Sequence, residues 1–274
     1  MTSTFMLHHQ LKHPKMGFGT YKLNPDDVAY DVLRYAMDQG IRHFDSAIIY
    51  RNEKALGQAI RDSGLPREAF FITSKLPPHI KHKDGALRMF ERTLKNLGFD
   101  YLDAYIINAP GPFDDLEGDY DEGNIEVYQT LETLYREGRV KAIGVSQFPL
   151  RLLNLLLERC AIVPHIHQIS YFVGHTRDEL VTFAKKHHIL IQAFSPLAKG
   201  YLLTNPTLNE IAKRYDVKPA TLALNYILQK GHAPIPKATT PTHVDDFYEM
   251  TIPIAPHDMH LLDQVKGDPR HYDD

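Results

Sequence analysis

Eight short apolar runs alternate with amphipathic helical patterns along this chain. The runs that we predict as strands cover residues 16–21, 41–47, 70–75, 101–108, 140–146, 165–171, 189–195 and 233–238. Most of the helical patterns between them end in glycine, a common helix-stop residue. Alternating strands and helices predict a parallel sheet. Eight such units in about 250 residues predict an α/β fold of the closed (β/α)8 type, a TIM barrel.

A doubly wound sheet is the alternative architecture. It would need fewer strands and usually a glycine-rich phosphate loop, but no Gly-x-Gly-x-x-Gly follows any predicted strand. The sequence therefore predicts a single barrel domain over residues 1–274, with a short N-terminal segment (1–15) and a C-terminal tail (249–274). We expect one long helical stretch from about Asn205 to Lys230.

Composition excludes several classes of function. The net charge of −3 shows no basic excess of the kind that nucleic-acid binders carry. Cys160 is the only cysteine, so an intrachain disulfide is impossible and a reducing compartment is the simplest expectation. We see no signal-peptide pattern and no apolar run of about 20 residues that could cross a membrane. We therefore expect a soluble, cytoplasmic protein without a membrane or nucleic-acid partner.

Polar or titratable side chains stand at the predicted carboxyl end of nearly every strand. In chain order the strand-end residues are Tyr21, Asp45, Lys75, Asn108, Ser146, Gln168, Phe194 with Ser195, and Lys237. Active sites of TIM barrels lie at this end of the strands. Turn chemistry explains one such residue, but it does not explain a ring of them. The ring therefore predicts a functional site at the carboxyl rim.

Asp45 and Lys75 end two consecutive predicted strands, and Tyr50 follows Asp45 by five residues. Opposite charges at such positions can pair. A free phenol has a pKa of about 10, and a nearby ammonium lowers that pKa because it favours the phenolate. The three residues are therefore a candidate general acid for a carbonyl oxygen. On spacing alone, a structural ion pair beside an unrelated tyrosine is an alternative interpretation.

The segment from His165 to His167 has the form His-x-His, which can ligate zinc on a strand of hydrolase barrels. Such barrels would carry this motif on the first strand, whereas here it lies on the sixth predicted strand. We therefore expect no metal site. We interpret the pair as one rim or pocket histidine and one buried or helix-facing neighbour.

The sequence resembles the aldo-keto reductase superfamily in a series of motifs that occur in the family order. They read GFGTYKL, FDSAIIYRNEKALGQAI, FFITSK, LGFDYLDAYIIN, GRVKAIGVSQF, AFSPLAKGYL and IPKATTP, and the resemblance covers about residues 16–248. It implies a barrel that transfers hydride from a nicotinamide cofactor to an aldehyde or ketone. Tyr50 would donate the proton to the carbonyl oxygen, with Lys75 and Asp45 tuning its acidity.

One departure from the family pattern concerns Asn108. The family's fourth catalytic residue is a histidine at the end of the fourth strand, and this sequence has Asn108 there. Histidine donates a hydrogen bond and can also titrate near neutral pH, whereas asparagine donates through its amide but cannot titrate. We therefore predict a working but altered catalytic site that includes Tyr50, Lys75, Asp45 and Asn108.

The resemblance also implies which residues bind the cofactor. They are Gly19, Thr20, Ser146, Gln147, Gln168, Phe194, Ser195, Leu197, Lys237, Ala238, Thr239, His243 and Asp246. Ser146, Gln147 and Gln168 would hold the nicotinamide carboxamide, although the family usually has asparagine at the position of Gln147. Phe194 would stack under the ring, and the loop that begins at Ser195 would wrap the pyrophosphate.

The segment after the eighth predicted strand departs from NADPH-using relatives. Their serine and arginine positions are Ala238 and His243 here, while Lys237 remains. Arginine is the stronger, bidentate phosphate ligand, and histidine is mostly neutral at pH 7. The contacts to a 2′-phosphate are therefore weakened. We expect NADPH as the cofactor, with NADH or dual use as the alternative.

The sequence thus predicts an oxidoreductase that reduces a small carbonyl substrate, with Tyr21 and Asn108 shaping the substrate end. A non-reductive relative that binds a dinucleotide as a sensor or regulatory subunit is the alternative, motivated by Asn108 and the weakened phosphate site. The sequence does not name the substrate or the oligomeric state.

Overall fold

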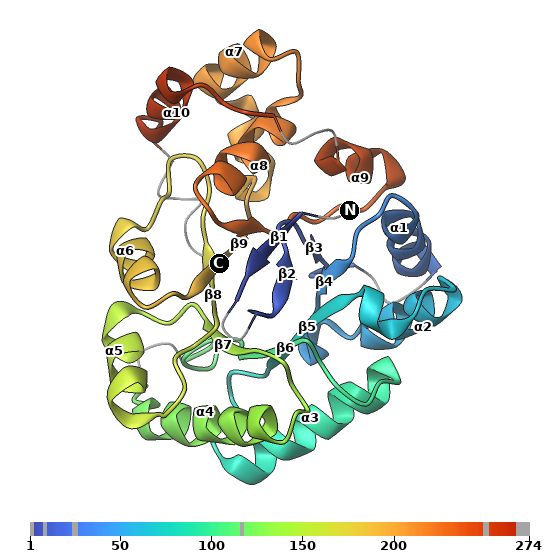
Figure 1. Cartoon of the computed structure of the whole chain (residues 1–274), viewed down its shortest axis with the longest axis vertical. Helices are drawn as coiled ribbons and strands as arrows, with labels where there is room; N and C mark the ends of the chain where they lie inside the picture. The colour runs from blue at the N-terminus through green and yellow to red at the C-terminus, as the bar shows by residue number, and fades with distance from the viewer. Residues whose placement is uncertain (1–2, 8–9, 24–26, 116–117, 249–251, 267–274) are drawn as a thin grey trace.

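The computed structural model describes residues 3–7, 10–23, 27–115, 118–248 and 252–266, apart from the side chains of residues 27–28 and 246–248. Within these residues eight strands pair in parallel in chain order and enclose the centre of the molecule (Figure 1). They are β3 (Phe18–Gly19), β4 (His43–Asp45), β5 (Phe71–Leu76), β6 (Ala104–Ile107), β7 (Ile143–Ser146), β8 (Ile166–Ser170), β9 (Leu190–Phe194) and β10 (Ala233–Pro234).

Backbone hydrogen bonds between the first and last strands close the sheet. Gly17 N–H donates to Pro234 O (3.0 Å), and Gly19 N–H donates to Pro236 O (2.8 Å). A Cβ on Gly19 would lie 3.1 Å from Ile235 O, so the close approach of the two strands favours glycine there. The predicted (β/α)8 barrel is confirmed.

Helices cover the outside of the barrel (Figure 1). They are α1 (Asp27–Asp38), α2 (Glu53–Asp62), α3 (Lys83–Leu97), α4 (Asp121–Arg136), α5 (Leu150–Arg159), α6 (Asp178–Lys186), α7 (Pro206–Arg214), α8 (Pro219–Gln229), α9 (Pro241–Tyr248) and α10 (Pro256–Asp263). Helix α3, for example, turns an apolar stripe inward and buries Phe90, Leu94 and Leu97 at helical spacing. None of the helices in the described part of the chain combines the length and apolar composition that a bilayer crossing needs.

The region expected to form one long helix contains two, α7 and α8. The chain turns at Asp216, whose φ is 52°, and Lys218 is extended before Pro219 begins α8. The residue before a proline avoids the helical conformation because the proline ring collides with its backbone. The expectation of a continuous helix from Asn205 to Lys230 was therefore wrong.

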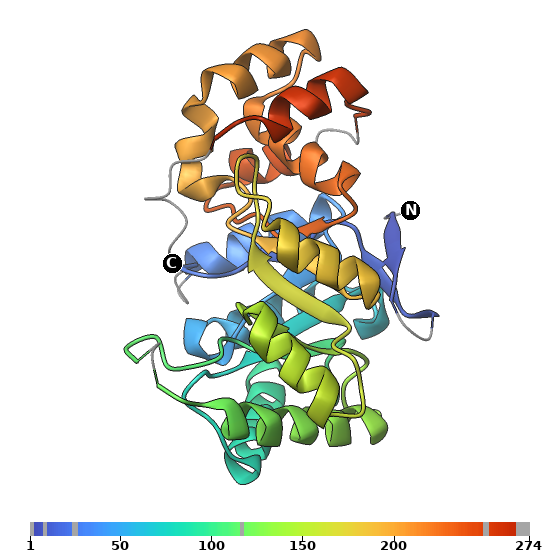
Figure 2. The same ribbon diagram turned by 90° about the vertical axis from the view of Figure 1, so that its left-hand side faces the viewer.

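A β-hairpin covers the amino end of the barrel. Strands β1 (Thr4–Met6) and β2 (Lys12–Pro14) pair antiparallel, and Leu7 between them packs with residues that begin the barrel strands, such as Phe71 and Leu190. Figures 1 and 2 place the hairpin across one end of the barrel. Active sites of TIM barrels lie at the carboxyl ends of the strands, so we expect the functional site at the rim opposite the hairpin.

Candidate active site

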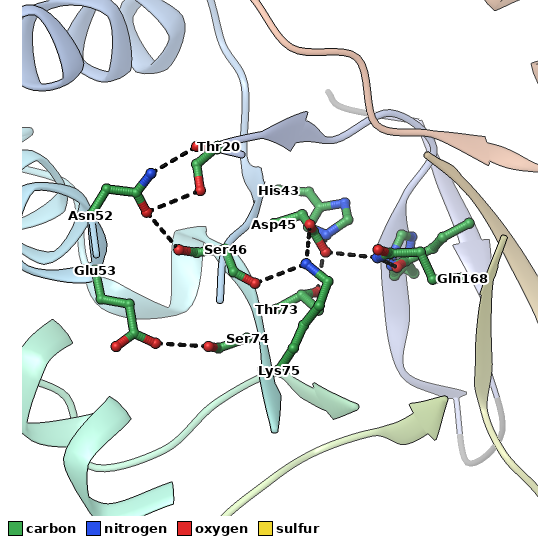
Figure 3. A network of polar contacts seen from close by, with 12 residues as sticks. Thr20, His43, Asp45, Ser46, Asn52, Glu53, Thr73, Ser74, Lys75 and Gln168 are labelled. Carbon is green, nitrogen blue, oxygen red and sulfur yellow. Dashed lines mark hydrogen bonds and ion pairs between the residues drawn. The ribbon is translucent and has the colours of Figure 1, made fainter. Parts of the chain in front are cut away.

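Asp45 and Lys75 form a buried ion pair at the carboxyl rim (Figure 3). Asp45 ends β4 and pairs in register with Thr73, so Lys75 lies two residues further along β5 on the same face. Lys75 Nζ donates hydrogen bonds to Asp45 Oδ1 and to Ser46 O (2.9 Å). Burial alone would lower the pKa of Lys75, but the charge of Asp45 and the neighbouring Tyr50 outweigh it, so the pKa lies above its ordinary value. Lys75 is therefore charged at neutral pH.

Tyr50 lies beside this pair at the end of the short helix η2 (Ile48–Tyr50). Lys75 Nζ is 4.9 Å from the centroid of its ring, and the ring of Tyr21 is 5.0 Å away on the rim. Burial raises the pKa of Tyr50, and Lys75 acts in the opposite direction with a smaller effect. The expected influence of Lys75 is present, but a net lowering of the pKa was wrong because desolvation of the phenolate outweighs it. Tyr50 therefore holds its proton at neutral pH.

Asn52 fixes the loops around Tyr50 and was not expected from the sequence. Its side-chain nitrogen donates to Thr20 O (2.7 Å) and Leu23 O (3.2 Å), and its oxygen accepts from the hydroxyls of Ser46 (3.0 Å) and Thr20 (3.2 Å). The amide thus joins the loops after β3 and β4 (Figure 3). The hydroxyl of Thr20, a predicted cofactor ligand, is engaged in this network.

Asn108 directly follows β6 and is buried next to the end of β5. Its backbone N–H donates to Leu76 O (3.0 Å), one residue beyond Lys75. Its side chain is 5% exposed and makes no hydrogen bond to the residues that the structure describes. The carboxamide is therefore available to a ligand at the rim, and the turn-starting role of its backbone is compatible with this.

The predicted ligands of the nicotinamide come together on neighbouring strands. Ser146 pairs in register with Gln168, and Phe194 ends β9 beside Ser170. Gln168 donates from its amide nitrogen to Asp45 Oδ2 (2.8 Å), and its oxygen accepts no hydrogen bond from the described residues. Gln147 has a φ of 60°, and its N–H donates to Gln168 O (2.9 Å). The amide oxygen of Gln168 is therefore free to accept a hydrogen bond from a ligand.

The loop after β9 contains an unusual run of left-handed backbone. Ser195, Ala198 and Lys199 have φ values of 48°, 47° and 54°, conformations that cost about 1–3 kcal/mol each and cluster at ligand sites. Leu197 packs against the core and anchors the loop. The loop begins the short helix η4 (Ala198–Thr204), so its path over the rim is fixed by packing.

The segment after β10 offers one cation to a phosphate. Three of the predicted cofactor ligands there are exposed, namely Lys237, Thr239 and His243. Burial and the neighbouring Lys22 lower the pKa of Lys237, and a bound anion would act in the opposite direction because it favours the charged ammonium. Ala238 is buried in the core and offers only its backbone. Asp246 lies in α9, and its side chain is outside the described part.

The His-x-His segment does not reach the rim. His165 precedes β8, and its Nδ1 accepts from Ile143 N–H (3.0 Å). His167 is fully buried on the face of β8 opposite to that of Gln168, and burial lowers its pKa to about 3. The expectation of one rim histidine was therefore wrong. Among the described residues, no three side chains of the metal-ligating types are grouped.

These features match a known family along most of the chain. The model of the Aldo/keto reductase family matches residues 15–266. This chain belongs to the aldo/keto reductase family. The resemblance expected from the motifs is confirmed.

Characterised and solved relatives agree with this assignment. The chain is 33% identical to the 9,11-endoperoxide prostaglandin H2 reductase of Trypanosoma cruzi (96% of this chain, 92% of the relative) and 32% identical to the glyoxal reductase of Bacillus subtilis (98% and 95%). An aldo-keto reductase from a Medee basin deep-sea metagenome library superposes with a TM-score of 0.90 at 33% identity (96% and 95%). Another aldo-keto reductase, solved in complex with NADPH, superposes with a TM-score of 0.88 at 26% identity, over 97% of this chain and 88% of the other.

Proposed function

We propose that this aldo/keto reductase reduces an aldehyde or ketone to an alcohol, using NADPH as the hydride donor and Tyr50 as the proton donor. The observation that carries the proposal is the buried Lys75–Asp45 pair directly beside Tyr50. When bound, the nicotinamide supplies the hydride. The protein supplies a proton at Tyr50 Oη and a positive charge at Lys75 that stabilises the phenolate left after proton transfer.

Asn108 positions the carbonyl in this scheme. Its amide N–H can donate a hydrogen bond to the carbonyl oxygen, and no described residue competes for it. An uncharged donor polarises the oxygen less than an imidazolium would, so this site depends more heavily on Tyr50. Tyr21, 55% exposed and next to Tyr50, forms a wall of the substrate site.

The side chains around the rim suit a nicotinamide dinucleotide. The free oxygen of Gln168 and the hydroxyl of Ser146 are hydrogen-bonding groups for the carboxamide, and the ring of Phe194 offers a face for stacking. Lys237 provides the charge for a phosphate. We propose NADPH over NADH because Lys237 is kept, with weak discrimination because His243 stands where a bidentate arginine would grip the 2′-phosphate.

Small aldehydes are the first substrates to test. Relatives include the glyoxal reductase above and the aldehyde reductase YPR1 of Saccharomyces cerevisiae, which is 33% identical over 277 residues. The assay follows oxidation of NADPH and NADH with a panel of aldehydes, α-dicarbonyls and ketones. Cofactor binding is measured separately from the fluorescence of the reduced nicotinamide, which is clean because the chain has no tryptophan. Binding without turnover on the whole panel would support the dinucleotide-sensor alternative and contradict the reductase.

Replacing Asn108 by histidine is expected to add a titration to catalysis. Asn108 cannot change charge, whereas an imidazole can, and burial of this position (5% exposed) lowers the imidazole pKa below its ordinary value of about 6.5. The ratio of kcat for the Asn108→His protein to kcat for the wild type should therefore rise only as the pH falls below about 6.5, because the charged imidazole is the stronger donor. Asn108→Gln, which keeps an amide, is the control. A pH-independent ratio for Asn108→His would show that this position does not touch the reacting oxygen.

Replacing His243 by arginine is expected to sharpen cofactor selection. A guanidinium can form two charge-assisted hydrogen bonds to a phosphate, and such bonds lower the dissociation constant of NADPH by about tenfold. The dissociation constant of NADH should stay the same because NADH has no 2′-phosphate. Fluorescence titration measures both values, with His243→Gln as an uncharged control. An equal gain for both cofactors would place His243 away from the 2′-phosphate.

A further inference from the structure

A row of buried amides runs from the catalytic pair towards the amino end of the barrel. Gln168 Nε2 donates to Asp45 Oδ2 (2.8 Å) and also to Gln192 Oε1 (2.9 Å). Gln192 Nε2 lies 2.9 Å from His13 Nε2. Gln192 and His13 are fully buried, and His13 belongs to β2 of the hairpin. Figure 3 shows the side chain of Gln168 reaching Asp45.

The charge of Asp45 fixes the direction of every hydrogen bond in this row. A carboxylate only accepts, so the amide nitrogen of Gln168 must face Asp45. The same nitrogen then needs an acceptor at Gln192, which turns the oxygen of Gln192 towards Gln168 and its nitrogen towards His13. His13 Nε2 must therefore accept, which places the proton of the neutral ring on Nδ1.

The surroundings of His13 keep the ring neutral. Burial lowers the pKa of His13 to about 4. The rings of His43 and Phe71 stand edge-on at 4.6 Å and 4.5 Å. His43 is itself held neutral, first by burial and then by His13 and Lys75, and its Nε2 lies 3.1 Å from the hydroxyl of Thr73. A charged His13 would have to donate to Gln192 and would reverse the row.

We propose that Gln192 and His13 are positioning residues for catalysis, which hold the amide of Gln168 so that its nitrogen orients Asp45 and its oxygen faces the cofactor site. The N-terminal hairpin then contributes to the active site through Gln192, in addition to covering the barrel. This inference rests on the proposed reductase function for its kinetic consequence only. The proton position on His13 follows from the row itself.

The kinetic test compares two substitutions of Gln192 with a control in the hairpin. Gln192→Leu removes the acceptor for Gln168, and we expect kcat to fall by about three- to tenfold, the effect of one hydrogen bond between neutral groups. Gln192→Glu keeps an acceptor for Gln168 but adds a buried charge, so we expect its kcat to lie above that of Gln192→Leu and its melting temperature to lie below that of the wild type. Leu7→Ala loosens the packing of the hairpin without touching the row, so it should lower the melting temperature but not kcat. If Gln192→Leu behaves like Leu7→Ala, the role of Gln192 is only structural and the proposal is wrong.

The spectroscopic test is independent of turnover. Two-dimensional 15N–1H NMR of the imidazoles should show His13 protonated on Nδ1 and bare on Nε2 in the wild type. In Gln192→Glu the new carboxylate accepts from the ring, so Nε2 should become protonated. A wild-type His13 with its proton on Nε2 would contradict the proposed directions of these hydrogen bonds, whether or not the protein reduces carbonyls. A wild type that shows the expected tautomer but no carbonyl turnover would contradict the reductase function and leave the geometry of the row supported.

Discussion

Replacing Tyr50 by phenylalanine is expected to lower kcat by about 10²–10⁴, the range for removal of a positioned proton donor. Tyr50 lies beside the Lys75 ammonium, and burial raises the pKa of its hydroxyl, which therefore keeps its proton at neutral pH. Phenylalanine preserves the ring and its packing on Tyr21. The dissociation constant of NADPH should therefore change little. Steady-state kinetics and fluorescence titration on the same preparation measure the two effects.

The matched control for this substitution is Tyr30→Phe. The hydroxyl of Tyr30 donates to Asp62 (2.7 Å) on the outside of the barrel, so its loss should leave kcat unchanged. Wild-type kcat in Tyr50→Phe would mean that another group protonates the substrate oxygen. Equal losses in both variants would point to a general effect of removing a tyrosine hydroxyl.

Replacing Lys75 by methionine is expected to lower the free energy of unfolding by about 3–5 kcal/mol, because it leaves the buried Asp45 carboxylate without its partner. In the wild type the pKa of Lys75 is raised, so its stabilising contribution is complete below the unfolded value of about 10.4 and is lost as the pH rises through the folded value. The variant should lack this alkaline loss. Urea denaturation at pH 7 and at pH 10–11 measures both effects.

A second substitution separates the charge from the packing at Lys75. Removing both members of a buried ion pair is often close to neutral, so Lys75→Met combined with Asp45→Leu should regain most of the lost stability while remaining inactive. If the double variant is as unstable as Lys75→Met alone, the loss comes from a packing defect and not from an unpaired carboxylate.

The barrel and its rim could be predicted from the sequence because both depend on local pattern. The strand-end residues Asp45, Lys75 and Asn108 were visible as polar groups that end apolar runs, and the parallel sheet places such ends together. The break between α7 and α8 was also encoded locally, in Lys218 and Pro219, but the apolar periodicity across it concealed the boundary.

Contacts between distant segments could not be predicted. Asn52 reads as an ordinary loop residue until its amide is seen to join Thr20 and Ser46. Gln192 reads as one polar residue within an apolar strand, and its partner His13 is 179 positions away. The pKa of Tyr50 depends on the balance between its burial, which raises it, and the charge of Lys75, which lowers it. A sequence gives neither the depth at which Tyr50 is buried nor its distance from Lys75.

The origin of the hydrogen in the product is the most direct test of hydride transfer from NADPH to a carbonyl. The purified protein would be incubated with each carbonyl of the panel and with NADPH that carries deuterium at both C4 positions of the nicotinamide, and the alcohol would be analysed by mass spectrometry. Hydride transfer from NADPH places one deuterium on the carbinol carbon for each NADPH oxidised, and this transfer should be slower in Tyr50→Phe. NADPH that binds but yields no deuterated alcohol from any carbonyl of the panel would contradict this hydride transfer.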